Sequence, residues 1–172
     1  MKYKSVTIRL PFLKETRDRK GTLHMKPCIT TLNEYRNAYF RTLNEQKKQW
    51  VITVKEAFEK IGYTTVRLKK KDKNQVYLLK NHKEEVLKGE CGRIKIVYHF
   101  PDNRNRDLDG NAIFAKYTLD AIIALGIFRD DNRNYIKFIS QEVGADSKDS
   151  FGYFDFTIRF VPREDLEDKT NE

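Results

Sequence analysis

The side chains that could do chemistry are concentrated in residues 102–131, which read DNRNRDLDGNAIFAKYTLDAIIALGIFRDD. Two arginines precede an Asp-Leu-Asp triplet, one lysine lies in an apolar stretch, and two aspartates close the segment. Carboxylates, with water and phosphate oxygens, are the ligands that suit Mg²⁺ or Mn²⁺ rather than zinc. Such ions hydrolyse phosphodiesters by polarising the phosphoryl group and activating water. The segment therefore indicates a metal site that faces a polyanion.

The spacing of the aspartates decides whether they can share one ion. Asp107 and Asp109 lie on the same side of an extended segment but on different sides of a helix. Because they directly follow a predicted strand, we expect an extended segment that points both carboxylates into one pocket. A helix over residues 111–125, about 22 Å long, then separates them from Asp130 and Asp131. The two pairs meet only if the chain beyond Gly126 turns back along this helix.

Each of these residues also has a purely structural interpretation. Asp107 could cap the helix N-terminus, and Asp130 with Asp131 could form an exposed turn. Lys116 and Asp120, four residues apart on a helix, could form a surface ion pair worth about 0.3 kcal/mol. Asp-x-Asp alone is a weak motif, so the prediction depends on the whole combination.

Apolar residues that alternate with polar ones predict four strands. These strands cover residues 3–10, 93–100, 135–143 and 153–161. The polar loop GADSKDSFG joins the last two, which predicts that they pair as an antiparallel hairpin.

A long helix is predicted between a capping box at Thr31 and Glu34 and a C-terminal cap at Gly62. Its apolar residues recur on one face, so Trp50 is expected in the core rather than in a base-stacking site. Residues 63–90 read as an insertion: a hairpin with the tip KKKDKN, followed by a short helix over 81–88.

These elements predict an α+β fold with one mixed sheet of four or more strands and two main helices. The single domain covers residues 1–161, with the basic hairpin as an insertion, and residues 162–172 form a charged tail.

The net charge of +9 is unevenly distributed along the chain. Residues 1–100 hold 24 Lys or Arg and 10 Asp or Glu, whereas the remainder holds 10 and 15. An excess of cations of this kind is typical of nucleic-acid binding. We expect phosphate contacts from an unstructured basic loop over residues 12–30 and from the hairpin tip. The residues concerned are Arg17, Arg19, Lys20, Lys69, Lys70 and Lys71. A solvated connector and ordinary surface lysines remain the alternatives.

The composition excludes several other classes of protein. No apolar run reaches the length needed to cross a bilayer, and the first ten residues do not have the pattern of a signal peptide. Two cysteines, Cys28 and Cys91, make neither a disulfide framework nor a zinc set. We expect a cytoplasmic protein that does not bind a membrane.

The stretches PDNRNRDLDG and KYTLDAIIALGIFRDD resemble the RusA family of Holliday-junction resolvases of bacteria and their prophages. The family signature is a Pro-Asp after a strand, a run of arginines, Asp-Leu-Asp, a helix with a lysine, Asp-Ala-Leu, a Gly-Phe-type turn and Asp-Asp. This chain has three extra residues between Asp109 and Lys116. If they extend the helix at its start, Lys116 faces the same way as the family's lysine. If they form a loop, the direction of Lys116 is not fixed by the resemblance.

The resemblance implies a Mg²⁺-dependent endonuclease, with Mn²⁺ as a possible substitute, that resolves four-way junctions in recombination, repair or phage replication. It assigns Asp107, Asp109 and Asp131 as metal ligands and Lys116 as the catalytic group that stabilises charge on the scissile phosphate. Arg104 and Arg106 are expected to contact DNA. A homodimer would nick opposing strands of the junction, in a bacterial or phage-infected cytoplasm. The alternative is a catalytically weak DNA-binding protein with the same fold.

Overall fold

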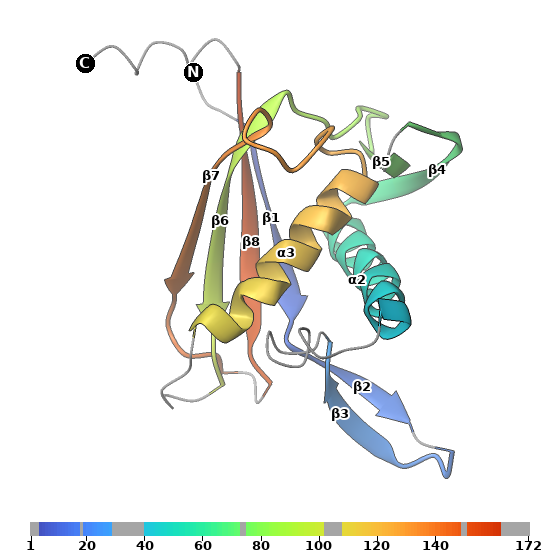
Figure 1. The fold of residues 1–172 in the computed structure, drawn as a ribbon, viewed down its shortest axis with the longest axis vertical. Coiled ribbons are helices and arrows are strands. Elements are labelled where there is room, and N and C mark those ends of the chain that lie inside the picture. Colours follow the sequence, from blue (N-terminus) through green and yellow to red (C-terminus); the bar gives the residue numbers. More distant parts are fainter. Residues whose placement is uncertain are drawn as a thin grey trace.

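The computed structural model describes residues 4–17, 19–28, 40–72, 75–101, 108–148 and 151–162. Within these ranges four strands form the main sheet, in the order β1-β8-β6-β7 (Figure 1). Their bounds are Ser5–Pro11 for β1, Tyr153–Val161 for β8, Cys91–His99 for β6 and Ile136–Val143 for β7. The β6–β7 pair is parallel and the other two pairs are antiparallel. The predicted mixed sheet of an α+β domain is confirmed.

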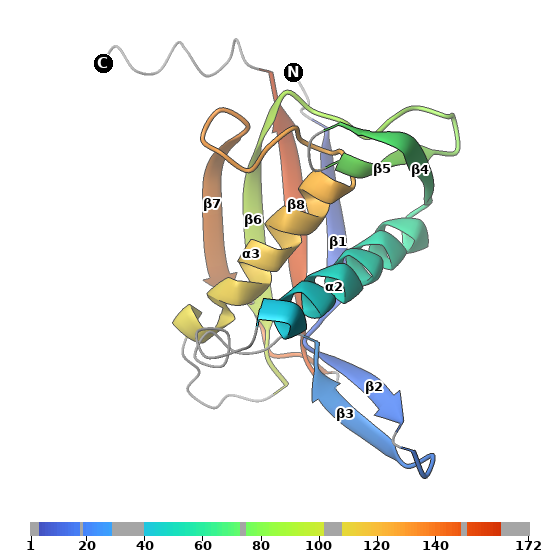
Figure 2. The same ribbon diagram turned by 45° about the vertical axis from the view of Figure 1, so that its right-hand side comes forward.

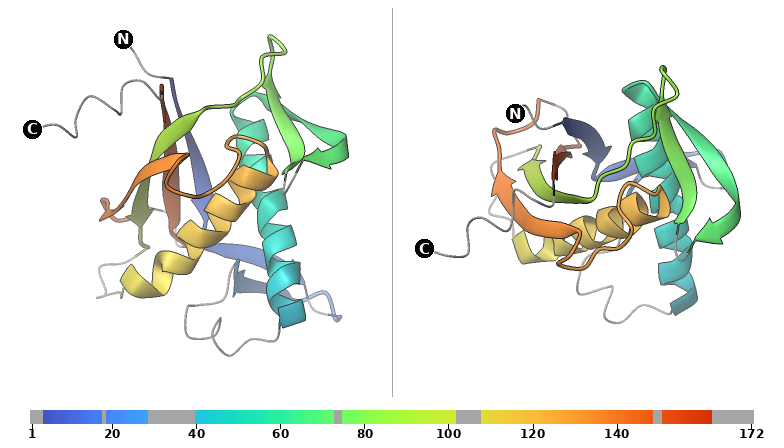
Figure 3. Two further views of the ribbon diagram at one scale, coloured as in Figure 1. Left: turned by 45° about the horizontal axis from the view of Figure 1, so that its top comes forward. Right: turned by 90° about the horizontal axis from the view of Figure 1, so that it is seen from above.

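Two helices, α2 (Phe40–Lys60) and α3 (Leu108–Ala124), cover the same face of the main sheet (Figures 1 and 3). The period-two alternation of the strands explains this arrangement, because every second side chain of β1, β6 and β8 is buried beneath the helices. Neither helix combines the length and the apolar character needed to cross a bilayer, among the residues described.

An aromatic cluster joins the helices to the sheet. Phe154 of β8 lies at ring-centroid distances of 5.5 Å from Phe114 and 6.1 Å from Trp50. The indole Nε1–H of Trp50 donates to the buried Thr118 hydroxyl at 3.0 Å, and this hydroxyl donates to the Phe114 carbonyl at 2.7 Å. Trp50 is therefore a core residue, as its place on the apolar face of the helix predicted.

The predicted C-terminus of the long helix is also confirmed. Gly62 has a φ of 91°, and its N–H donates to the Glu59 carbonyl at 3.0 Å. A positive φ is accessible to glycine without steric cost, so the residue ends α2. The predicted capping box at Thr31 and Glu34 lies outside the described residues.

Outside residues 102–131, three predictions about the fold are wrong. The basic segment after β1 is not an unstructured loop, since β2 (Leu13–Arg17) and β3 (Leu23–Pro27) pair as an antiparallel hairpin. This hairpin extends away from the main sheet (Figure 2). Its charged residues conceal the strand pattern because a projecting hairpin has no core-facing side that requires apolar side chains.

The short helix predicted over residues 81–88 is absent from that described segment, which forms a turn. The Asn81 carboxamide oxygen accepts hydrogen bonds from the N–H groups of Lys83, at 2.9 Å, and Glu85, at 3.0 Å. Asn side chains compete with helical hydrogen bonds in this way and so favour turns.

The third error concerns the pairing of the last two strands. β7 and β8 are not neighbours, because β8 lies between β1 and β6 while β7 pairs with β6 at the sheet edge. The predicted hairpin is confirmed, and it consists of β4 (Tyr63–Asp72) and β5 (Gln75–Asn81). Lys69, Lys70 and Lys71 belong to β4 rather than to the predicted tip.

Candidate functional site at the third helix

The helix α3 begins at Leu108, so Asp109 and Gly110 lie in its first turn. The extended conformation predicted for Asp-Leu-Asp is therefore wrong from Leu108 onwards. An aspartate in the first turn is favoured by the partial positive charge of a helix N-terminus, which explains why the helix starts this early. Asp107 and the two predicted DNA contacts Arg104 and Arg106 lie outside the described residues.

The early start determines the direction of Lys116. All residues from Asp109 to Lys116 are helical, and seven residues make about two turns. The three extra residues therefore extend the helix, and the position of Lys116 falls on the same face of α3 as that of Asp109. Asp120 follows one turn later on this face. Lys116 is exposed.

The chain reverses direction directly after α3. Gly126 has a φ of 72°, its N–H donates to the Ile123 carbonyl at 2.9 Å, and the Ile127 N–H donates to the Ile122 carbonyl at 3.0 Å. This pair of hydrogen bonds is a Schellman motif. Ile127 and Phe128 are buried in the core, which anchors the turn and positions the residues that follow it.

A cleft lies beside the C-terminal half of α3. Asp120, Asp130 and Asp131 line this cleft of about 300 Å³ together with Ile123, Ala124 and Lys47. The Lys47 Nζ lies 2.8 Å from Asp120 Oδ2 and 5.6 Å from the centroid of the Tyr117 ring. Asp120 therefore forms an ion pair with Lys47 of α2 rather than the pair with Lys116 considered above.

The two adjacent aspartates have different environments. One carboxylate oxygen of Asp130 accepts the Asp131 N–H at 2.8 Å, and the other accepts the Asn132 side-chain amide at 2.9 Å. Asp130 therefore stabilises the turn, as its structural interpretation allowed. Asp131 is exposed and lines the cleft.

One protomer does not bring the positions of Asp109 and Asp131 together. Asp131 lies beside Asp120–Ala124, whereas Asp109 is eleven residues before Asp120, or about 16 Å along the helix axis. Figure 1 shows the two ends of α3 at opposite ends of the main sheet. Within the described ranges no three His, Cys, Asp or Glu side chains are grouped to hold a metal ion.

Comparison with known protein families and with curated proteins finds no match to this chain. The functional interpretation therefore depends on the residues themselves.

The residues predicted to contact phosphate lie on the β2–β3 hairpin and on the β4–β5 hairpin. Arg19 and Lys20 are exposed in the turn between β2 and β3, and Arg17 is the last residue of β2. Lys69, Lys70 and Lys71 lie in the second half of β4. The two hairpins start from different parts of the body (Figures 1 and 2).

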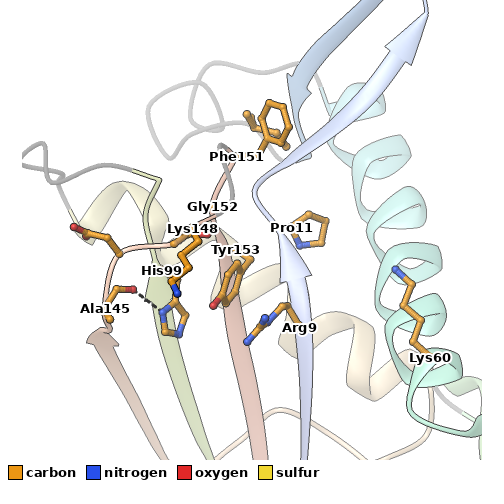
Figure 4. A pocket seen from close by; sticks show the side chains of 12 residues that line it. Arg9, Pro11, Lys60, His99, Ala145, Lys148, Phe151, Gly152 and Tyr153 are labelled. Carbon is orange, nitrogen blue, oxygen red and sulfur yellow. Dashed lines mark hydrogen bonds between the residues drawn. The ribbon is translucent and has the colours of Figure 1, made fainter.

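A larger groove of about 680 Å³ lies near Arg9, His99 and Tyr153. Figure 4 shows the Tyr153 ring between the other two side chains, with the Arg9 guanidinium carbon 3.7 Å from the ring centroid. Asp155 accepts hydrogen bonds from Arg9 at 2.9 and 3.1 Å, which raises the pKa of the arginine. Because Arg9 is already paired with Asp155, this groove is a weaker candidate for a functional site than the α3 cleft.

Sequence reasoning missed Lys47 as a member of the site. Lys47 lies within the predicted long helix, where no local pattern distinguishes it from the other lysines of that helix. Its contact with Asp120 depends on how α2 crosses α3, and no local pattern reports that crossing.

Proposed function

We propose that the protein is a metal-dependent, structure-selective endonuclease that cuts branched DNA such as four-way junctions. The observation that supports the proposal is the arrangement of charged residues along α3. Asp109, Lys116 and Asp120 occupy one face of the helix, and Asp131 lies beside its end. The resemblance to RusA resolvases assigns functions to three of these four positions.

The donor set fits a hard divalent cation, because it consists of carboxylates without His or Cys. Asp107, Asp109 and Asp131 would hold Mg²⁺ or Mn²⁺, which polarises the scissile phosphate and activates water when bound. Lys116 would donate to the phosphate oxygens on which charge develops. Arg104, Arg106 and the two basic hairpins would bind the flanking phosphates.

The length of α3 argues that two protomers form each site. Asp109 lies in the first turn of α3, whereas Asp131 lies beyond the end of the helix, beside Asp120–Ala124 and about 16 Å further along the helix axis. Ligands of one Mg²⁺ lie about 2.1 Å from the ion. A two-fold dimer can place Asp131 of one copy beside Asp109 of the other.

The activity has a direct test. The purified protein should nick a synthetic four-way junction in Mg²⁺ or Mn²⁺ and lose this activity in EDTA. Linear duplex of the same sequence should be cut far more slowly. Equal cutting of junction, duplex, flap and RNA would instead indicate a general nuclease.

Mixing two inactive variants tests whether the site is shared between protomers. Asp109→Asn and Asp131→Asn proteins are each expected to be inactive. After unfolding and refolding together, half of the dimers combine one chain of each kind and contain one site with both aspartates. We expect about a quarter of the wild-type nicking rate to return, because one site in four is intact.

Two controls complete the mixing experiment. Each variant refolded alone reports the background, and mixed wild-type protein reports the yield of refolding. No recovery in the mixture, with full recovery of wild type, would mean that both ligands come from one chain.

A second candidate function is junction binding without cleavage. The pairing of Asp120 with Lys47 favours it, because the ion pair removes one free carboxylate from the cleft. Gel-shift binding of a junction, with no nicking at any Mg²⁺ or Mn²⁺ concentration, would establish this alternative.

A further inference from the structure

The helices α2 and α3 leave the other face of the main sheet uncovered (Figures 1 and 3). Arg9, His99 and Tyr153 point to this uncovered face, because their neighbours along each strand are buried beneath the helices. Register places Tyr153 directly opposite both Pro11 and His99. The groove of about 680 Å³ lies at this end of the face, and its size falls within the range of about 300–1,000 Å³ that is usual for small-molecule sites.

Three side chains form an ordered stack in the groove. The guanidinium carbon of Arg9 lies 3.7 Å from the centroid of the Tyr153 ring, and the His99 ring stacks on this ring at a centroid distance of 4.7 Å. Asp155 holds the guanidinium through its Nε and Nη2 atoms. The Arg9 side chain is still 60% exposed, and its Nη1 atom makes no hydrogen bond to the described residues. The pairing therefore orients Arg9 and leaves one nitrogen able to donate to an anion.

The segment that follows β7 forms a second wall of the groove. The Ser147 N–H donates to the Phe100 carbonyl at 2.7 Å, and the His99 Nδ1 lies 2.8 Å from the Ala145 carbonyl oxygen. Both contacts fix this segment, which carries Lys148, against the end of β6. The groove is therefore formed before a ligand binds, which lowers the entropic cost of binding.

Cations outnumber carboxylates in the lining of the groove. It contains Arg9, Lys60 and Lys148 but only one carboxylate, that of Asp146. Both lysines are exposed, and neither forms an ion pair with any residue that the structure describes. Cationic side chains gathered in a groove without matching carboxylates attract an anion. Arginine and lysine together are the usual donors to a phosphate group.

The groove also has an apolar end. Figure 4 shows Phe151 apart from the stacked side chains of Arg9, Tyr153 and His99. The Phe151 side chain is 41% exposed. Gly152 has a φ of 67°, and a Cβ atom there would lie 2.8 Å from the His99 carbonyl oxygen, so glycine is required between the two ends. An exposed aromatic ring is a surface on which a planar ring can stack.

We propose that this groove binds a small organic phosphate with a planar ring, such as a nucleoside 5′-monophosphate. The phosphate contacts the Arg9 Nη1 and the Lys148 ammonium group, and the planar ring stacks on Phe151. The groove shares no lining residue with the α3 cleft, and its binding needs no metal ion. Both ends of the groove are required, because the cations bind only the phosphate and the aromatic ring binds only the planar group.

Calorimetric titration tests the ligand class. Adenosine 5′-monophosphate (AMP) should bind with one site per chain in EDTA, which removes any complex bridged by a metal ion. Inorganic phosphate and adenosine should each bind at least tenfold more weakly, since each contacts one end of the groove and stacking on an aromatic side chain strengthens binding about tenfold. Absence of AMP binding would overturn the proposal. Either fragment binding as tightly as AMP would overturn it too.

Two variants assign the ends of the groove. Lys148→Gln should weaken the binding of both AMP and inorganic phosphate about tenfold. Phe151→Ala should weaken AMP about tenfold and leave the binding of inorganic phosphate unchanged. Both side chains are exposed, so the melting temperature should change little. The matched control is Lys83→Gln, which alters an exposed lysine outside the groove and should bind AMP as wild type does. Wild-type affinity for AMP in either groove variant would contradict the proposal.

Nuclear magnetic resonance locates the bound ligand. AMP should shift the amide signals of Lys148 and Gly152 and leave those of Asp120 and Asp131 in place. Shifts confined to the two aspartates would put the ligand in the α3 cleft and contradict the proposal. The result is independent of the proposed endonuclease. A protein that binds AMP in the groove but does not nick junctions supports the groove site, and one that nicks but does not bind AMP contradicts this site alone.

Discussion

Asp109→Asn is expected to lower the rate of junction nicking by about 10³-fold, because an amide is a far weaker ligand for Mg²⁺ than a carboxylate. Loss of several kcal/mol of charge stabilisation in the transition state corresponds to this factor. Junction binding should persist, since the phosphate contacts come from cationic residues elsewhere. Nicking is measured in single-turnover reactions and binding by gel shift in Ca²⁺.

The control for this substitution is Asp146→Asn. Asp146 is an exposed carboxylate that lines the larger groove rather than the α3 cleft. It undergoes the same change of charge without involving the proposed metal ligands, so its nicking rate should equal that of wild type. Full activity of Asp109→Asn would eliminate the metal-site assignment, and loss of activity in both variants would point to a general effect of charge.

Phe154→Ala is expected to lower the free energy of unfolding by about 4 kcal/mol, the usual cost of removing a buried phenylalanine. Phe154 is fully buried and packs against rings from the sheet, the β1–β2 connection and both helices. Its removal leaves a cavity where these elements meet. For a chain of this size the melting temperature should fall by about 8–16 °C, as measured by calorimetry or circular dichroism.

Phe151→Ala is the matched control, because Phe151 is a partly exposed phenylalanine only three residues away. It should change the free energy of unfolding by less than about 1 kcal/mol. Similar effects of the two substitutions would show that the aromatic cluster does not carry the stability of the fold.

The α+β class, the four strands of the main sheet and the core position of Trp50 could be predicted because each depends on a local pattern. A strand with one buried face must alternate, and a helix with one buried face must repeat its apolar residues every three or four positions. The ends at Gly62 and Gly126 could be predicted for a similar reason, since a positive φ selects glycine.

The wrong predictions concern segments in which the local sequence pattern is weak or in which two patterns favour different structures. The β2–β3 hairpin has no alternation to reveal it, because it projects from the core. Residues 81–88 have a composition that favours a helix, but the hydrogen bonds accepted by the Asn81 side chain hold this segment in a turn. The Asp-Leu-Asp segment was assigned an extended form from the preceding strand, but α3 begins at Leu108.

For the candidate site, the types of the side chains and their order along the chain were determined by the sequence alone. Two arginines, an Asp-Leu-Asp triplet, a lysine and two further aspartates, in that order, already predict metal-assisted chemistry on a phosphodiester. Only the tertiary structure decided which groups are neighbours. Lys47 meets Asp120 because α2 crosses α3, and Asp131 lies far from Asp109 because a rigid 17-residue helix separates the ends of the segment. Strand order was decided in the same way, because placing β8 between β1 and β6 depends on burying apolar faces that are distant in sequence.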